Sequence, residues 1–438
     1  MGRLLHIILL GMVLSLWVTP IQAQLGPHLG GGLGNGLGNG LDLPLRQLPG
    51  DVLPDALDSL DSDTDRLSQD VRQTSESVSR DLVGRPLQAK MLDRDPSGAA
   101  IVKDRILAVS PNAHSLAIAG QLHFAVLAQD KFAALGLVGV TLQVPDGMTE
   151  VAALTVLRAA DPNGAYDYDH VYQPEGDSVA ASAGANAARE IAKKIRLGMI
   201  DGGIEKQHPS LANQTIVTRS FAGAGDPPAT QHGTAIASLL IGGDGSFSGY
   251  LPGATLYAAD VYGGAADGGS AADIAGALNW LAGNRIPVTN ISLAGPDDAL
   301  LAAAVKAFVT QGYVLVAAVG NDGPAAPPNY PAAYPGVVGV TSVDAALHLE
   351  IDANRNAARF AARGVDVTAA QLPNGYAGVT GTSYAAPVVT AQIALLVDRP
   401  DARLVQMSLD RISHATLPLS NTGPLLIAAP KAMSSTTR

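Results

Sequence analysis

Cysteine is absent from all 438 positions of this chain. Its absence excludes thiol nucleophiles, disulfide frameworks and cysteine-bound metals. Basic residues are also scarce, because 28 lysines and arginines stand against 39 aspartates and glutamates, which gives a net charge of −11. Such a surplus of negative charge provides no basic surface for phosphate backbones, and we expect no nucleic-acid partner. Apolar residues are plentiful at 47% of the chain, enough for a large core.

The amino terminus lacks an apolar run of membrane-spanning length. The run over residues 4–18 is shorter than the roughly 20 residues that a spanning helix needs. It follows Arg3 and precedes Pro20 and the small residue Ala23, which is the pattern of a secretory signal peptide. The sequence therefore predicts a signal peptide over residues 1–23, its removal after Ala23, and secretion into the periplasm or medium with no membrane anchor left.

Two segments of biased composition follow. Residues 24–54 repeat Gly-Leu-Gly-Asn, but a phosphate-binding glycine loop needs a strand before it and a helix after it. We therefore expect a flexible Gly/Leu-rich segment. In residues 55–83, leucines and valines recur at helical spacing among many acidic and basic residues, which predicts an acidic amphipathic helix. This helix could dock on the rest of the chain or form a weak coiled coil.

Residues 84–175 are predicted to form a small α+β unit. Runs rich in β-branched residues predict strands at 99–110, 123–129, 136–145 and 166–174, and helical patterning predicts helices at 112–121 and 149–161. The order βαββαβ is the ferredoxin-like arrangement, which hosts many functions. The last strand alternates aromatic and acidic residues, which we interpret as an edge strand rather than a cofactor site: Tyr166, Tyr168, His170 and Tyr172.

An alanine-rich linker, residues 176–194, separates this unit from residues 195–438. Nearly continuous apolar runs there predict buried strands at 195–201, 254–262, 287–294, 312–321 and 336–344, and helical patterning is found at 232–243, 270–283, 297–312 and 383–398. Strands that alternate with helices predict an α/β fold with a doubly wound parallel sheet. Ligands of such sheets bind at the carboxyl ends of the strands.

Four polar residues are expected at that edge of the sheet: Asp201 and Asn321 at the ends of strands, and His232 and Ser383 at the starts of helices. An imidazole can take a proton from a hydroxyl, a carboxylate can hold the imidazole tautomer, and an amide can stabilise an oxyanion. Taken alone, Ser383 fits a helix N-cap, with Pro387 in a first turn that tolerates a missing N–H.

The segments around these residues, "GMIDGG", "QHGTAIAS", "AAVGNDG" and "GVTGTSYAAP", resemble the aspartate, histidine, oxyanion and serine motifs of the subtilases, the subtilisin-like serine proteases. The separations of 31 residues from Asp201 to His232 and 151 from His232 to Ser383 are also similar to the family's. The resemblance covers about residues 195–396. It implies that His232 deprotonates Ser383 and that Asp201 orients His232. Asn321 would stabilise the oxyanion as a polypeptide substrate is hydrolysed through an acyl-enzyme.

The resemblance also implies a substrate groove and a propeptide. "NISLAG" resembles the family's substrate-binding strand, and the residues that we expect to contact substrate are Ser292, Leu293, Ala294, Gly295 and Asn329. Added side-chain volume at Ala294 and Asn329 predicts small or medium residues before the scissile bond. The unit at 84–175 is similar to the inhibitory propeptide of these enzymes, which implies a secreted zymogen whose own N-terminal domain is a partner.

The chain departs from the family at three places. Gly202 follows Asp201 where a serine or threonine is usual, Ser210 stands where many subtilases have an aspartate calcium ligand, and "IGGDGSFSGYLPG" is shorter than the calcium-binding loop. Calcium cages need several oxygen ligands. We therefore expect no cofactor, no metal ligands and no strong calcium site of that type.

Two other functions remain open. The first is a catalytically weak or permanently inhibited subtilase that acts as an envelope binding protein. The second is an α/β-hydrolase esterase, which is disfavoured because Gly-Thr-Ser-Tyr-Ala breaks the glycine spacing of a nucleophile elbow and the histidine precedes the serine.

Overall fold

The computed structural model describes residues 92–174, 177–179, 192, 194–223, 225–264, 268–416 and 425–427. All of these residues belong to one compact unit that spans Leu60–Arg438. The expected signal peptide, Gly/Leu-rich segment and amphipathic helix lie outside the described residues. Among the described residues, no helix combines the length and apolarity that a membrane crossing requires.

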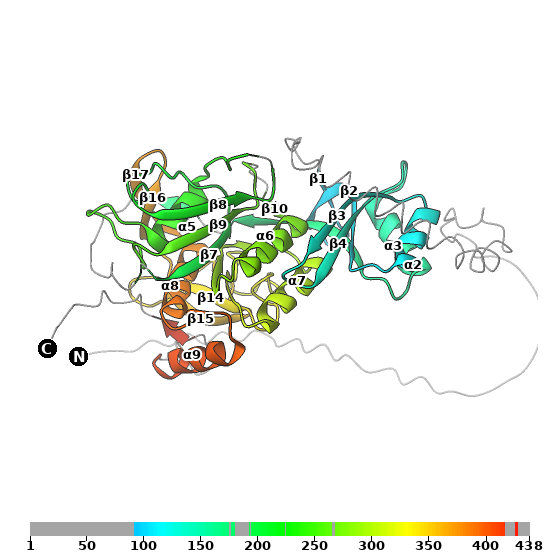
Figure 1. The fold of residues 1–438 in the computed structure, drawn as a ribbon. Coiled ribbons are helices and arrows are strands. Elements are labelled where there is room, and N and C mark those ends of the chain that lie inside the picture. The colour runs from blue at the N-terminus through cyan, green and yellow to red at the C-terminus, as the bar shows by residue number, and fades with distance from the viewer. Residues whose placement is uncertain are drawn as a thin grey trace, which may run out of the picture. The chain divides into compact units, whose positions relative to one another are not determined.

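The centre of the fold is a parallel sheet (Figure 1). Its strands in spatial order are β18 (Leu425–Ile427), β15 (Ala358–Arg363), β14 (Val338–Val343), β13 (Val314–Ala318), β11 (Val288–Ile291), β7 (Arg196–Asp201), β9 (Thr255–Asp260) and β8 (Thr215–Ser220). Every neighbouring pair is parallel. All residues of β11, β13 and β14 are buried, which explains the nearly continuous apolar segments in which they lie. The predicted α/β fold with a doubly wound parallel sheet is confirmed.

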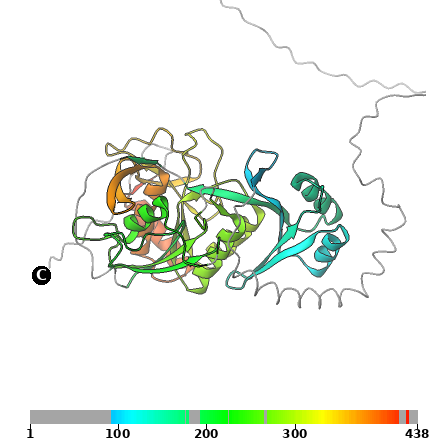
Figure 2. The ribbon, with the colours of Figure 1, turned by 90° about the horizontal axis from the view of Figure 1, so that it is seen from above.

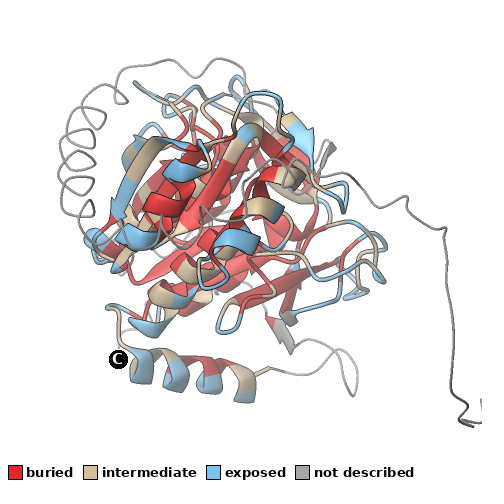
Figure 3. Cartoon of the chain, turned by 90° about the vertical axis from the view of Figure 1, so that its right-hand side faces the viewer, coloured by how far each residue is buried: buried red, intermediate tan, exposed pale blue. Residues whose placement is uncertain are grey.

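Helices cover both faces of this sheet. They are α5 (Gln231–Ile241), α6 (Ala271–Gly283), α7 (Ala299–Thr310), α8 (Thr382–Ala394) and α9 (Ala402–His414). α5, α8 and α9 contribute to one apolar cluster, and α6 and α7 contribute to another. The burial colouring shows α9 exposing one face at the surface (Figure 3), as its strongly amphipathic sequence requires.

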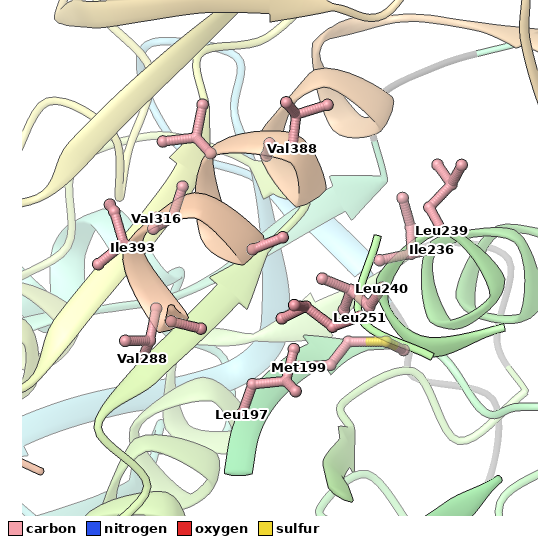
Figure 4. Packing of buried hydrophobic residues seen from close by; sticks show 14 of the residues in the cluster. Leu197, Met199, Ile236, Leu239, Leu240, Leu251, Val288, Val316, Val388 and Ile393 are labelled. Atoms are coloured by element: carbon pink, nitrogen blue, oxygen red, sulfur yellow. The ribbon is translucent and has the colours of Figure 1, made fainter. Parts of the chain in front are cut away.

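Alternate residues of each strand supply the two clusters. Leu197 and Met199 of β7 belong to the cluster under α5 and α8, which is drawn in Figure 4, whereas Ile200 belongs to the cluster under α6 and α7. This alternation follows from the two-residue period of a strand. Because both faces are covered, the strand ends are the places where polar side chains gather.

The N-terminal module, residues 92–174, has its own sheet and core. Its elements are β1 (Leu92–Arg94), β2 (Ala100–Val109), α2 (Ala113–Gln121), β3 (Ala125–Phe132), β4 (Leu137–Gln143), α3 (Glu150–Ala160) and β5 (Tyr166–Pro174). The strands from β2 to β5 lie in the order β5-β2-β4-β3, with all pairs antiparallel. Side chains of β2, β4, α3 and β5 form a separate apolar core.

Strand β5 is not an edge strand, and this corrects the sequence-based interpretation. It pairs with β2 on one side and, at its C-terminal end, with β10 (Gly269–Ser270) and β12 (Leu293–Ala294) of the C-terminal module, which comprises the described residues from Lys194 onwards. Figure 2 shows β5 running from its own sheet to the C-terminal module. Tyr172 is fully inaccessible to solvent at this contact, whereas Tyr166 and Tyr168 belong to the apolar core of the N-terminal module itself.

A short strand follows β5 directly along the chain. Residues Asp177–Val179, within the expected linker, form β6, which pairs antiparallel with β17 (Gly375–Thr380). β17 also pairs with β16 (Val367–Gln371) in a small separate sheet. β6 was not predicted because three residues are too few to show a strand pattern.

Candidate active site

Asp201 and His232 meet at the carboxyl edge of the parallel sheet. Asp201 is the last residue of β7, and His232 is in the first turn of α5, which is capped by Thr230. His232 Nδ1 lies 2.9 Å from Asp201 Oδ1, and the carboxylate is fully buried. The backbone N–H of Gly202 donates to the same oxygen over 2.7 Å. A carboxylate held in this way fixes the imidazole tautomer and leaves Nε2 as the ring atom that can exchange a proton with a hydroxyl.

Asp201 Oδ2 is a buried oxygen that accepts no hydrogen bond within the described residues. The comparison with the subtilase motif singled out Gly202 because it lacks the hydroxyl that is usual at this position. Asp201 Oδ2 is the carboxylate oxygen that has no such hydroxyl as a donor. Tolerating an unpartnered buried carboxylate oxygen is costly. The orientation of Asp201 therefore rests on His232 and on the Gly202 N–H.

Ser383 lies in the first turn of α8 and does not cap it. The N-cap is Gly381, which has φ 147° and makes no side-chain cap hydrogen bond, so the predicted capping role of Ser383 is wrong. Ser383 Oγ instead donates to the carbonyl of Ser292 over 3.0 Å. The nucleophile candidate is thus held against the strand that we expect to bind substrate, and it is completely buried.

Pro387 lies inside α8, beyond its first turn, which corrects a second expectation. A proline at this position supplies no N–H to the carbonyl four residues earlier, which is that of Ser383. The hydroxyl of Ser292 donates to this carbonyl over 2.9 Å and replaces the missing bond. Ser292 and Ser383 are therefore joined by two reciprocal hydrogen bonds.

Behind this pair lies a buried polar chain that the sequence did not reveal. Asn290 Nδ2 donates to Ser292 Oγ over 2.9 Å, and Thr390 Oγ1 donates to Asn290 Oδ1 over 3.0 Å. All of these side chains are fully buried. The contacts join β11 to α8 across about a hundred residues of sequence, so spacing gave no indication of them.

Asn321 follows β13 and is tied to the start of α8. Its Oδ1 accepts the Thr382 backbone N–H over 3.0 Å, and the Gly320 N–H donates to Thr382 Oγ1 over 3.2 Å. Gly320 has φ 98°, a left-handed conformation that favours glycine. These bonds place the Asn321 amide beside the helix that carries Ser383, in the region where an oxyanion donor is required.

The other predicted substrate-binding residues lie on or beside β12. Leu293 and Ala294 form β12, and Gly295 makes a two-way backbone bridge to Tyr330 at 2.9 Å. A Cβ on Gly295 would lie 2.5 Å from the Tyr172 ring, so the groove fits that ring only because of this glycine. Asn329 Nδ2 donates to Asp322 Oδ2 over 2.6 Å and to the Val319 carbonyl over 3.3 Å, alongside Gly320.

Ser210 lies in a hydrogen-bonded cluster with His208. His208 is fully buried, with Nδ1 2.8 Å from Ser210 Oγ and Nε2 2.9 Å from the Gly375 carbonyl. Its ring packs edge-on against Tyr376, whose hydroxyl donates to Asp244 Oδ2 over 2.5 Å. An imidazole and a hydroxyl thus fill the place that the sequence comparison assigned to a calcium ligand.

The fold and site together define a serine-type peptidase: a doubly wound sheet that carries an aspartate, a histidine, an asparagine and a serine at one edge. The Subtilase family (Peptidase S8) model matches residues 192–417. The chain belongs to the subtilase family.

Named relatives agree with this membership. The chain is 33% identical over 243 residues to the major intracellular serine protease of Bacillus subtilis (strain 168), a match that covers 51% of this chain and 74% of that protein. It is 31% identical over 247 residues to subtilisin DY of Bacillus licheniformis, covering 52% and 85%. Among solved structures, fervidolysin from Fervidobacterium pennivorans shares the fold with a TM-score of 0.64 and 18% identity, over 78% of this chain and 63% of that one.

Proposed function

We propose that this chain is a secreted serine endopeptidase made as a zymogen, with Asp201, His232 and Ser383 as its catalytic triad. His232 would take the proton of Ser383 Oγ as the oxygen attacks a peptide carbonyl, and Asp201 would stabilise the imidazolium. Asn321 Nδ2 and the Ser383 N–H would donate to the tetrahedral oxyanion. The acyl-enzyme is then hydrolysed by water. The observation that carries the proposal is the 2.9 Å contact between His232 and the buried Asp201.

Attack requires one local rearrangement. The Ser383 hydroxyl donates to the Ser292 carbonyl in the described structure, so it must turn to His232 Nε2 before its proton can transfer. Rotation about a single side-chain bond of a serine is sufficient for this change. The buried position of Ser383 supports a latent form of the enzyme, in which substrate cannot reach the hydroxyl.

The zymogen proposal is supported by the path of the chain past Ser383. At the end of β5, Gln173 and Pro174 pair antiparallel with β12, and after a two-residue interval β6 pairs antiparallel with β17, which leads into α8. Strand addition of this kind is a common way for proteins to hold an extended peptide. We infer from these two pairings that the N-terminal module occupies the substrate groove as a substrate would, and we expect self-cleavage at one of the three peptide bonds between Pro174 and Asp177.

Tyr172 supports selection of an aromatic residue upstream of the cut. Its ring is fully buried, and its hydroxyl donates to the Pro296 carbonyl over 2.7 Å. A Cβ on Gly268 would lie 1.8 Å from the Tyr172 carbonyl oxygen, so the groove closes tightly around this residue. The Asn329–Asp322 hydrogen bond would limit the volume available to the substrate residue directly before the scissile bond. It therefore supports the expected preference for small or medium residues there.

Secretion rests on the predicted signal peptide over residues 1–23. Membership of the subtilase family does not by itself support secretion, because one relative is named an intracellular protease. Secretion into the periplasm or medium is therefore a separate proposal, which the N-terminal sequence of the exported protein would test.

A second candidate function is a permanently inhibited subtilase that acts as an envelope binding protein. The full burial of Ser383 and the pairing of β5 and β6 with the groove favour it. The two functions differ in whether the chain between β5 and β6 is ever cut.

Intact mass and N-terminal sequencing of the wild type and of Ser383→Ala distinguish them. We expect a new amino terminus between residues 175 and 177 in the wild type and an uncut chain in the variant. Absence of a cut in both proteins would favour permanent inhibition. An identical cut in both would refute self-processing, because another enzyme must then make it.

A further inference from the structure

A buried histidine joins the two modules. His170 of β5 is only 3% exposed, and its Nδ1 lies 3.1 Å from Oδ2 of Asp298, the N-cap of α7 in the C-terminal module. Its Nε2 lies 3.4 Å from Oδ2 of Asp95, which follows β1 in the N-terminal module. Both ring nitrogens therefore face carboxylates, and only a protonated imidazole donates to both.

A third carboxylate lies against the same group. Asp167, three residues before His170 on β5, accepts the Ala299 N–H at the start of α7 over 2.9 Å. One carboxylate oxygen of Asp167, one ring nitrogen of His170 and one carboxylate oxygen of Asp298 all lie within 4.8 Å of one another. Two carboxylates from different modules thus meet at one imidazole, with a third on its far side.

The remaining polar neighbours do not balance this charge. Arg158 of α3 approaches Asp167 at 3.7 Å but is 54% exposed, so its charge is well screened. Beside these groups lie the edge-on ring of Tyr168, the hydroxyl of Tyr334 on the Asp298 backbone, and the Arg105–Asp169 pair at 4.0 Å. Three carboxylates facing one imidazole are an excess of buried negative charge, which favours a bound proton.

The pKa directions agree with this charge count. Burial alone lowers the pKa of His170, but the hydrogen bonds to Asp298 and Asp95 and the charges of Asp298 and Asp167 outweigh burial and raise it. Burial and the charge of Asp298 raise the pKa of Asp167 as well. Both groups therefore hold protons more tightly when the modules are in contact.

We propose that His170, Asp298, Asp95 and Asp167 form a proton-dependent latch that holds the N-terminal module in the groove at acidic pH and loosens at alkaline pH. It rests on the proposed function only in that loosening would expose Ser383 to substrate. The sign follows from linkage: a raised histidine pKa gives stabilisation that is fully present below the pKa of the open form, about 6.5, and is lost as pH rises through the pKa of the closed form. Above that range, Asp167 and Asp298 repel each other across the contact.

Hydrogen exchange on full-length Ser383→Ala tests the latch without relying on activity. The amides of β5 and β12 report its opening, and those of β11 serve as an internal control for the buried sheet. After correction for intrinsic exchange, we expect protection of β5 and β12 to fall as pH rises from 5.5 to 9, while β11 stays constant. A difference of one between the closed-form and open-form pKa of His170 corresponds to about a tenfold change.

Variants on both modules sharpen the test. His170→Gln and Asp298→Asn are expected to lower protection at acidic pH and to abolish the pH dependence. Asp167→Asn keeps an oxygen for the Ala299 N–H but removes a negative charge, so it is expected to increase protection at pH 9. His114→Gln changes an exposed histidine of the same module and is expected to match the parent.

Several results would overturn the proposal. Protection that is independent of pH in the parent, or a pH dependence that survives in both His170→Gln and Asp298→Asn, excludes the latch. A loss of protection on adding a chelator at pH 6 excludes it too, because the cluster would then hold a metal ion rather than a proton. Failure of Ser383→Ala to block self-cleavage would refute the proposed nucleophile and leave these exchange results unaffected.

Discussion

Gly202→Ala is expected to destabilise the C-terminal module more than an alanine substitution normally does. A Cβ at this position would lie 2.4 Å from Thr230 Oγ1, 2.7 Å from Thr230 Cγ2 and 2.7 Å from Tyr262 Cδ2. Thr230 cannot move without loss, because its Oγ1 accepts the Gly233 N–H over 3.0 Å and caps the helix that carries His232. The residue after Asp201 is therefore small because the cap of α5 occupies the space.

The magnitude follows from two costs. Losing a threonine N-cap costs about 1 kcal/mol, and overpacking a well-filled site costs about 1–3 kcal/mol. We expect Gly202→Ala to lower the free energy of unfolding by roughly 2–4 kcal/mol. Urea unfolding in the Ser383→Ala background measures this without self-digestion.

A double variant identifies the cause. Thr230→Gly removes both overlapping Thr230 atoms, and glycine is an acceptable N-cap that costs only a few tenths of a kcal/mol. Adding it to Gly202→Ala should recover the part of the lost stability that is due to Thr230, while the overlap with Tyr262 Cδ2 remains, so the two substitutions should be non-additive. Equal stability of Gly202→Ala and its parent, or purely additive effects, would refute the argument that Thr230 dictates the glycine.

Three further predictions concern the site. Asn321→Ala should lower kcat about 10²–10³-fold with little change in KM, measured on a short peptide, because one oxyanion donor is lost; a change confined to KM would contradict this role. Asn329→Gly should shift a peptide-library profile towards larger residues before the cut, since it removes the partner of Asp322; an unchanged profile would show that Asn329 does not limit the pocket. Calcium should leave the melting temperature nearly unchanged, because Ser210 bonds to His208; a large chelator-reversible rise would contradict this.

The sequence predicted the buried strands well for a physical reason. β7, β9, β11, β13 and β14 are covered on both faces and so lie in nearly continuous apolar segments. The strands and helices that were missed lack such apolar segments. β8 alternates exposed and half-buried residues at the sheet edge, and α9 is amphipathic with low mean hydropathy.

The sequence predicted those contacts of the site that follow from the order of strands and helices along the chain. The carboxyl-edge rule brought Asp201 and His232 together, and the structure places them in contact. The carboxyl-edge rule could not indicate that Ser383 Oγ bonds to the Ser292 carbonyl. That contact depends on a side-chain rotamer and joins residues that are 91 positions apart in the sequence. The pairing of β6 with β17 was hidden for the same reason, since it spans about two hundred residues of sequence.

Cutting the chain between Pro174 and Asp177 would not by itself open the groove. The N-terminal module also contacts α6 and α7 through hydrogen bonds that no cut removes: the Ala134 N–H to Asn279 Oδ1 at 2.8 Å and Gln311 Nε2 to the Ala134 carbonyl at 2.9 Å. Apolar side chains of the N-terminal module join the cluster under α6 and α7: Leu107, Phe132, Leu135 and Tyr172. Because these contacts persist, release is a separate event from cleavage. The carboxylates around His170 are the part of the contact whose interaction energy depends on protonation, so the proposed latch is where the pH of the surroundings would set the moment of release.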